Sequence, residues 1–99
     1  MKETDLYHPI KRFFEESGYE VKAEITDCDV VAIKEGDAPI IIELKKVLSI
    51  DFLVQSIDRQ LISDYVYLAV PHGNGKVFKK RLVGFVRLCK RLGLGLLSV

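Results

Sequence analysis

Residues 39–46 read Pro-Ile-Ile-Ile-Glu-Leu-Lys-Lys, and the interpretation of the whole chain depends on this segment. Its aliphatic residues predict a buried β-strand, yet Glu43 and Lys45 interrupt them two residues apart. Residues i and i+2 of a strand project from the same face, so the carboxylate and the ammonium group are expected side by side. Because burying either charge without a partner is costly, the segment predicts either a solvated Glu–Lys pair or a site with a compensating partner.

Two further β-rich runs precede this segment, at residues 19–25 and 28–34. The short polar connection Glu-Gly-Asp-Ala at residues 35–38 is of the kind that joins antiparallel neighbours, so a three-stranded meander is predicted. Asp29 lies in the middle strand of that meander. The hairpin can therefore bring Asp29 beside Glu43.

Helical and strand patterns alternate in the rest of the chain. Helices are predicted over residues 4–17, 49–63 and 77–92, and strands over residues 65–70 and 94–99. The fold class is therefore α/β, with the order α-β-β-β-α-β-α-β and a mixed sheet flanked by helices. The middle helix places five apolar residues on one face, and Gln55, Asp58 and Arg59 lie away from it. The five apolar residues are Ile50, Leu53, Val54, Ile57 and Leu61.

The composition of the 99 residues suits one small domain over residues 1–99. Its net charge of +1 hides a split: residues 1–70 carry all 14 acidic residues and 8 basic ones, whereas residues 71–99 carry 7 basic residues and none acidic. Such asymmetry is typical of nucleic-acid or membrane surfaces. The sequence contains no signal peptide or membrane-length apolar run, so a cytoplasmic protein without membrane contact is expected. Cys28 and Cys89 fit no disulfide or zinc pattern and are expected to be reduced core residues.

Two carboxylates on adjacent strands suit a hard divalent cation. Mg²⁺ keeps most of its water and takes one or two protein carboxylates together with substrate phosphate oxygens, and Mn²⁺ is an alternative. A neighbouring lysine can orient a water nucleophile or stabilise charge on the phosphate. The pattern of Asp29, Glu43 and Lys45 therefore predicts a metal-dependent phosphodiesterase.

At these residues the chain resembles the PD-(D/E)xK nuclease superfamily, the fold of restriction endonucleases and Holliday-junction resolvases. The resemblance is carried by Asp29, by Ile-Ile-Ile-Glu-Leu-Lys at residues 40–45 and by Gln55 on the following helix. It covers roughly residues 3–70 and looks closest to a bacterial branch of the superfamily. A restriction-endonuclease-like core is the fold that it implies.

The resemblance also implies roles for individual residues. Asp29 and Glu43 would ligate Mg²⁺ or Mn²⁺, with the Leu44 carbonyl as a further ligand, and Lys45 would serve the nucleophilic water. Gln55 would position substrate or water. Glu3 is either an accessory acid from the first helix or a capping or solvated residue. Asp27 has the same strand parity as Asp29 and is the alternative ligand.

The third helix carries a basic stripe. Lys76, Lys80, Arg87 and Arg91 follow helical spacing opposite its apolar face. This stripe either tracks nucleic-acid phosphates or is only a solvated face. Arg59 likewise either binds phosphate or pairs with Asp58 or Asp64.

The function expected from the sequence is a Mg²⁺-dependent nuclease that hydrolyses phosphodiester bonds of nucleic acid, with DNA as the expected substrate, by metal-activated water. A homodimer that presents two sites to a duplex is an additional expectation, which sedimentation tests. The alternative is a catalytically inactive nucleic-acid-binding or interaction module on the same fold. A third interpretation is an incomplete core that lacks part of the substrate cleft.

Overall fold

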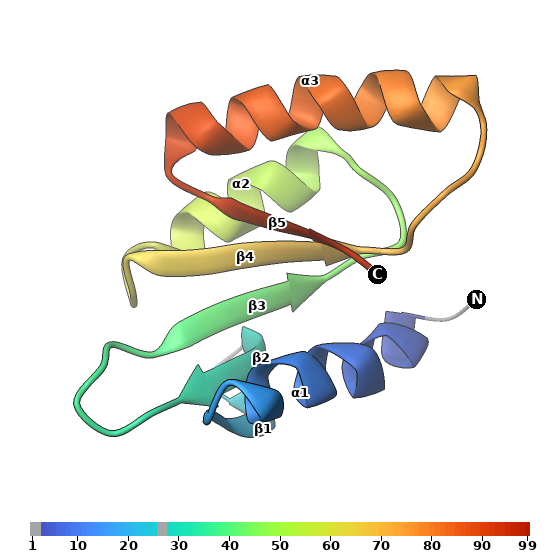
Figure 1. Cartoon of the computed structure of the whole chain (residues 1–99). Helices are drawn as coiled ribbons and strands as arrows, with labels where there is room; N and C mark the ends of the chain where they lie inside the picture. Colours follow the sequence, from blue (N-terminus) through green and yellow to red (C-terminus); the bar gives the residue numbers. More distant parts are fainter. Residues whose placement is uncertain (1–2, 26–27) are drawn as a thin grey trace.

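The computed structural model describes residues 3–25 and 28–99, which form one five-stranded mixed sheet with helices on both faces (Figure 1). The elements are, in chain order, the 3₁₀ turn η1 (Glu3–Leu6), α1 (Tyr7–Glu16), β1 (Glu20–Ile25), β2 (Cys28–Ile33), β3 (Ile40–Leu44), α2 (Ile50–Arg59), β4 (Tyr65–Val70), α3 (Lys76–Leu92) and β5 (Gly95–Ser98). The predicted class and element order are confirmed. The main difference in bounds is that α2 ends at Arg59, because residues 60–62 form turns instead of continuing the helix.

The sheet keeps its strands in chain order, β1-β2-β3-β4-β5. The first three strands are antiparallel, which confirms the meander, and Val30 lies opposite Ile42 in the β2–β3 register. The last three are parallel, with Ile42 opposite Tyr67. Parallel neighbours need a crossover, which α2 and α3 provide. The carboxyl ends of β3, β4 and β5 consequently lie at the same end of the sheet (Figure 1).

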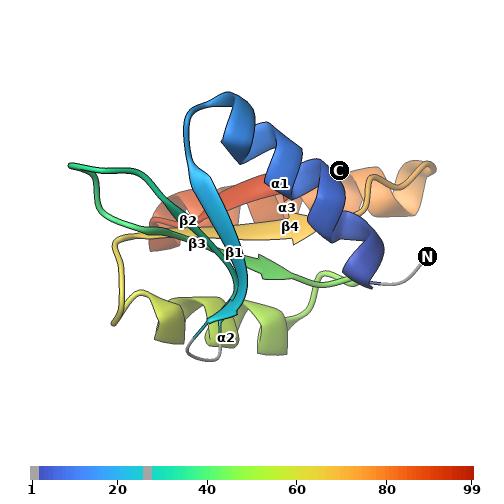
Figure 2. The same cartoon turned by 90° about the horizontal axis from the view of Figure 1, so that it is seen from below.

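The two faces of the sheet bury separate cores. On one face, Ile40 and Ile42 pack with Ile10 and Phe14 from the α1 side. On the other face, Ile41 joins a core to which α2 and α3 contribute. Figure 2 shows α1 and α2 on opposite sides of the sheet. All five residues of β3 are therefore buried, including its one charged residue.

Helix α2 buries a different face from the one that its apolar periodicity predicts. Of the five residues predicted to share its apolar face, only Leu53 is buried, and it lies in the core with Phe52. The other four are exposed, with Leu61 91% exposed just beyond the helix; they are Ile50, Val54, Ile57 and Leu61. The inward face instead presents the partly buried Gln55 and Arg59 to β3. The prediction that these two polar residues lie away from the packed face was wrong.

Two smaller expectations concern the cysteines and the membrane. Cys89 is a free, buried thiol of α3, as expected, while the Cys28 side chain lies outside the described part of the chain. Among the helices of residues 3–25 and 28–99, none is long and apolar enough to cross a membrane.

The orientation of α2 predicts opposite outcomes for two adjacent residues. Leu53→Ala should lower the free energy of unfolding by about 2–5 kcal/mol, because it leaves a cavity in the core. Val54→Ala, on the exposed face, should change the free energy of unfolding by less than about 0.5 kcal/mol. Urea denaturation of both variants measures the difference. If Val54→Ala is the more destabilising of the two, the orientation of α2 is incorrect.

Candidate functional site

Asp29 and Glu43 lie opposite each other on β2 and β3. The β2–β3 register, in which Val30 faces Ile42, continues to this pair. The Asp29 backbone N–H donates to Glu43 Oε2 at 3.0 Å, and the Leu44 N–H donates to Asp29 Oδ2 at 2.9 Å. Each carboxylate therefore binds a backbone N–H of the neighbouring strand. The structure brings together the two acids that the sequence singled out, and both project toward the α2 side because they share parity with Val31 and Ile41.

Glu43 is the electrostatic centre of this site. Its side chain is 0% exposed, and Arg59 Nε lies 2.6 Å from Oε1. Gln55 Nε2 donates to the same oxygen at 3.3 Å. With the Asp29 N–H on Oε2, the carboxylate accepts bonds from β2 and from α2. Among the described residues, no buried side-chain nitrogen or oxygen lacks a hydrogen bond.

The surroundings of Glu43 act on its pKa in both directions. Burial away from water is the largest influence and raises the pKa, and the negative charge of Asp29 raises it further. The Asp29 backbone N–H and the Arg59 guanidinium both lower it. The net result is a pKa above the ordinary glutamate value. The folded protein therefore holds this proton more tightly than the unfolded chain does.

Helix α2 positions the two side chains, Gln55 and Arg59, that donate to Glu43. Ser49 caps its start by accepting a hydrogen bond from the Phe52 N–H at 3.1 Å. Gln55 and Arg59 are four residues apart and so lie on the same side of α2. Arg59 was expected to bind phosphate or to pair with Asp58 or Asp64. The structure shows an ion pair with Glu43, which is 16 residues away in sequence, and phosphate binding stays a prediction. The expectation missed this pair because it considered only neighbouring acids.

Lys45 follows the last residue of β3. Its backbone N–H donates to the Ala69 carbonyl at 3.1 Å and extends the pairing with β4, while its side chain is partly buried. The interpretation of Glu43 and Lys45 as a solvated pair was wrong, because Glu43 is fully buried and its ion-pair partner is Arg59. Lys45 nevertheless lies two residues after Glu43, at the end of the sheet where β3 terminates.

The oxygen atoms at this site are of the kind that a divalent cation binds. Two carboxylates and the nearby Leu44 carbonyl are oxygen ligands of the type that Mg²⁺ takes from proteins. Within residues 3–25 and 28–99, no group of three or more His, Cys, Asp or Glu side chains is arranged to hold a metal. Asp27, the alternative ligand, lies outside the described residues, as does the side chain of Glu3, whose backbone begins η1. Asp29 and Glu43 are thus the acids that the structure pairs.

The basic stripe of α3 is solvent-exposed along its length. All four of its residues are exposed, namely Lys76, Lys80, Arg87 and Arg91. The first half of α3 is held against the loop after β3, because Arg81 Nη2 donates to the Leu48 carbonyl at 2.6 Å. The second half runs back toward the start of β5 (Figure 1). Lys76 and Lys80 therefore lie at the end of the sheet where the acids are, whereas Arg87 and Arg91 lie toward the opposite end.

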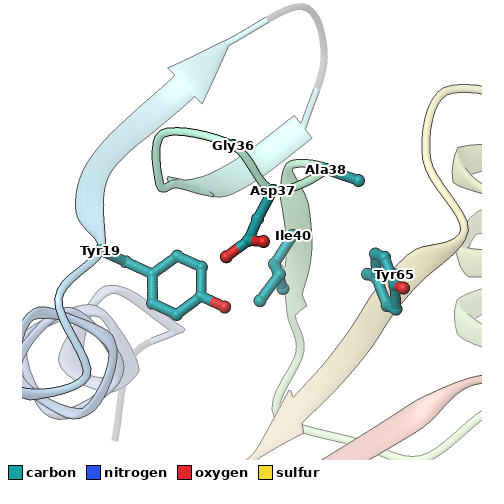
Figure 3. A pocket seen from close by; sticks show the side chains of 6 residues that line it. All are labelled: Tyr19, Gly36, Asp37, Ala38, Ile40 and Tyr65. Atoms are coloured by element: carbon teal, nitrogen blue, oxygen red, sulfur yellow. The ribbon is translucent and has the colours of Figure 1, made fainter.

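A cavity of about 490 Å³ lies at the other end of β3, beside Ile40. Figure 3 shows the Asp37 carboxylate between the rings of Tyr19 and Tyr65, with Gly36 and Ala38 completing the wall. None of the candidate catalytic, metal-binding or nucleic-acid-binding residues predicted from the sequence lines this cavity. The carboxylate pair and the cavity are therefore separate features of the molecule.

No protein-family model matches this chain, and neither the curated proteins nor the solved structures include a match.

The electrostatics of Glu43 predict opposite pKa changes in two variants. Arg59→Gln should raise the pKa of Glu43, because it removes a cation that favours the ionised form, whereas Asp29→Asn should lower it by removing a neighbouring negative charge. Carbon-13 NMR titration of the Glu43 carboxyl measures both shifts, with Asp37→Asn as a remote control. A Glu43 pKa that moves in the same direction in both variants would contradict this account.

The same pKa has a consequence for stability. Because the folded-state pKa of Glu43 lies above the unfolded one, binding of a proton to Glu43 stabilises the folded protein. This contribution to the free energy of unfolding is complete at acidic pH, below the unfolded-state pKa. That contribution is lost as the pH rises through the folded pKa.

Proposed function

We propose that this protein is a Mg²⁺- or Mn²⁺-dependent nuclease that hydrolyses phosphodiester bonds, with DNA as its substrate. The observation that carries the proposal is the pairing of Asp29 and Glu43 across adjacent strands, with Lys45 following directly on β3. Two carboxylates and a lysine are the groups needed for metal-assisted phosphodiester hydrolysis.

The arrangement of elements supports assignment to the PD-(D/E)xK superfamily. A helix, an antiparallel three-stranded meander, a helix and a parallel strand follow one another in the order expected of a restriction-endonuclease-like core. The paired acids lie on the second and third strands of the meander, and Gln55 lies on the helix that follows. These placements agree with the positions that the sequence resemblance implies.

Each residue has a role that its position allows. Asp29 and Glu43 would hold the cation, with the Leu44 carbonyl beside them. Bound there, Mg²⁺ would polarise the phosphodiester and activate a water for attack. The Lys45 ammonium would stabilise negative charge that develops on the phosphate oxygens. Gln55 would keep Glu43 oriented through its hydrogen bond to Oε1.

The exposed cations of α3 would supply contacts that do not depend on base sequence. Lys76 and Lys80 lie at the end of the sheet that carries the acids, so they are the nearer candidates for phosphate binding. Such contacts contribute affinity that falls as the salt concentration rises.

Cleavage of DNA tests the proposal. The protein should cleave plasmid or oligonucleotide DNA in Mg²⁺ or Mn²⁺, and EDTA should abolish the cleavage. Lys45→Ala and Glu43→Gln should each lower the cleavage rate by about 100-fold or more, because they remove groups that act on the reacting phosphate or on the metal. Gel-based rate measurements at saturating metal provide the comparison.

Lys46→Ala is the matched control, because Lys46 is the exposed neighbour of Lys45 and is assigned no role in the reaction. It should retain the cleavage rate of the unaltered protein. DNA cleavage that survives unchanged in both Lys45→Ala and Glu43→Gln would contradict the proposal.

One observation favours a second candidate, a nucleic-acid-binding module on the same fold without turnover. The Arg59 guanidinium already neutralises Glu43 from within the protein. In that case the protein would bind DNA without metal and with steep salt dependence, and no divalent cation would produce cleavage.

A further inference from the structure

The Arg59 guanidinium lies against Glu43, the carboxylate that is proposed to bind the metal ion. Arg59 Nε lies 2.6 Å from Glu43 Oε1, and the carboxylate has no exposure to solvent. Charge-assisted bonds of this length are among the stronger hydrogen bonds in proteins. The chain itself thus supplies a cation to one carboxylate of the pair, that of Glu43.

The hydrogen bonds of Glu43 leave little room for a second cation. Oε1 accepts from both Arg59 and Gln55, and Oε2 accepts from the Asp29 N–H. A carboxylate offers about four acceptor positions in all. A divalent ion bound to Glu43 would also lie against the guanidinium, where water is excluded and the repulsion between like charges is only weakly screened.

We propose that Arg59 is a positioning residue that acts as an internal counter-ion of Glu43, and that a divalent cation binds only when the guanidinium leaves Oε1. The inference rests on the proposed metal site. Arg59 and the metal ion compete for one carboxylate oxygen. Metal binding is therefore an exchange of cations instead of the filling of a ready site.

The location of Arg59 permits this exchange. It is the last residue of α2, and turns follow it directly at residues 60–62. Its side chain is 19% exposed, so the guanidinium has a route to solvent. Glu43, on the buried strand β3, stays in place. In the absence of metal, the guanidinium spares the protein an uncompensated buried charge.

Binding of Mn²⁺ alone tests the competition. Electron paramagnetic resonance should show that Arg59→Gln binds Mn²⁺ with a dissociation constant lower by on the order of tenfold, because a charged hydrogen bond no longer has to be broken. Arg12→Gln is the matched control, since it removes the same charge from an exposed position on α1, across the sheet from the site. Arg12→Gln should bind Mn²⁺ as the unaltered protein does.

A second measurement uses the unaltered protein and so does not depend on the folding of a variant. Nitrogen-15 NMR should show the Arg59 Nε–H proton shifted downfield and protected from exchange without metal, as expected for a short bond to a buried carboxylate. Saturating Mg²⁺ should remove that shift and protection. An Arg59 Nε–H signal that stays unchanged at saturating Mg²⁺ overturns the inference.

The outcomes separate this inference from the proposed function. Equal Mn²⁺ affinity in Arg59→Gln and the unaltered protein, with loss of binding in Glu43→Gln, overturns the competition and leaves the metal site intact. Absence of Mn²⁺ binding in every form, including Arg59→Gln, removes the metal site and the competition together.

Discussion

A carboxylate without access to water needs hydrogen-bond donors, and Glu43 imposes this requirement on the middle of the sheet. It lies on β3, between β2 and β4, and its neighbours Ile42 and Leu44 on β3 and Leu68 on β4 are apolar. The donors come from the Asp29 backbone on β2 and from Gln55 and Arg59 on α2. The orientation of α2 follows, because only one side of that helix can provide a guanidinium. The cost is an exposed apolar strip along its other side.

The same constraint shapes what the site can do. Asp29 and Glu43 are oxygen ligands on adjacent strands, as phosphodiester chemistry with a divalent cation requires. In the structure, however, their charge is balanced in part by Arg59. Of the two functions that we propose, nuclease and binding module, the ease with which Arg59 leaves Glu43 would decide between them. The acids, the lysine and the basic helix would be the same in either case.

The sequence predicts the sheet better than it predicts the site. Runs of β-branched residues separated by a short polar turn are local signals, and they identified the meander and the pairing of Asp29 with Glu43. The orientation of α2 was not predictable from periodicity, because the apolar residues at 50, 54, 57 and 61 form a more regular stripe than Phe52, Leu53 and Ser56 do. The four-residue spacing of Gln55 and Arg59 was the available signal. That spacing could be interpreted only with the contact between Arg59 and Glu43, which are 16 residues apart in the sequence.

Glu43 and Arg59 stabilise each other as a buried pair, and a double-mutant cycle tests this mutual stabilisation most directly. The free energies of unfolding of the unaltered protein, Glu43→Gln, Arg59→Gln and the double variant would be measured by urea denaturation at neutral pH. Breaking a buried pair costs more than replacing both partners, so a coupling energy of about 2 kcal/mol is predicted. A coupling energy within about 0.5 kcal/mol of zero would contradict the account.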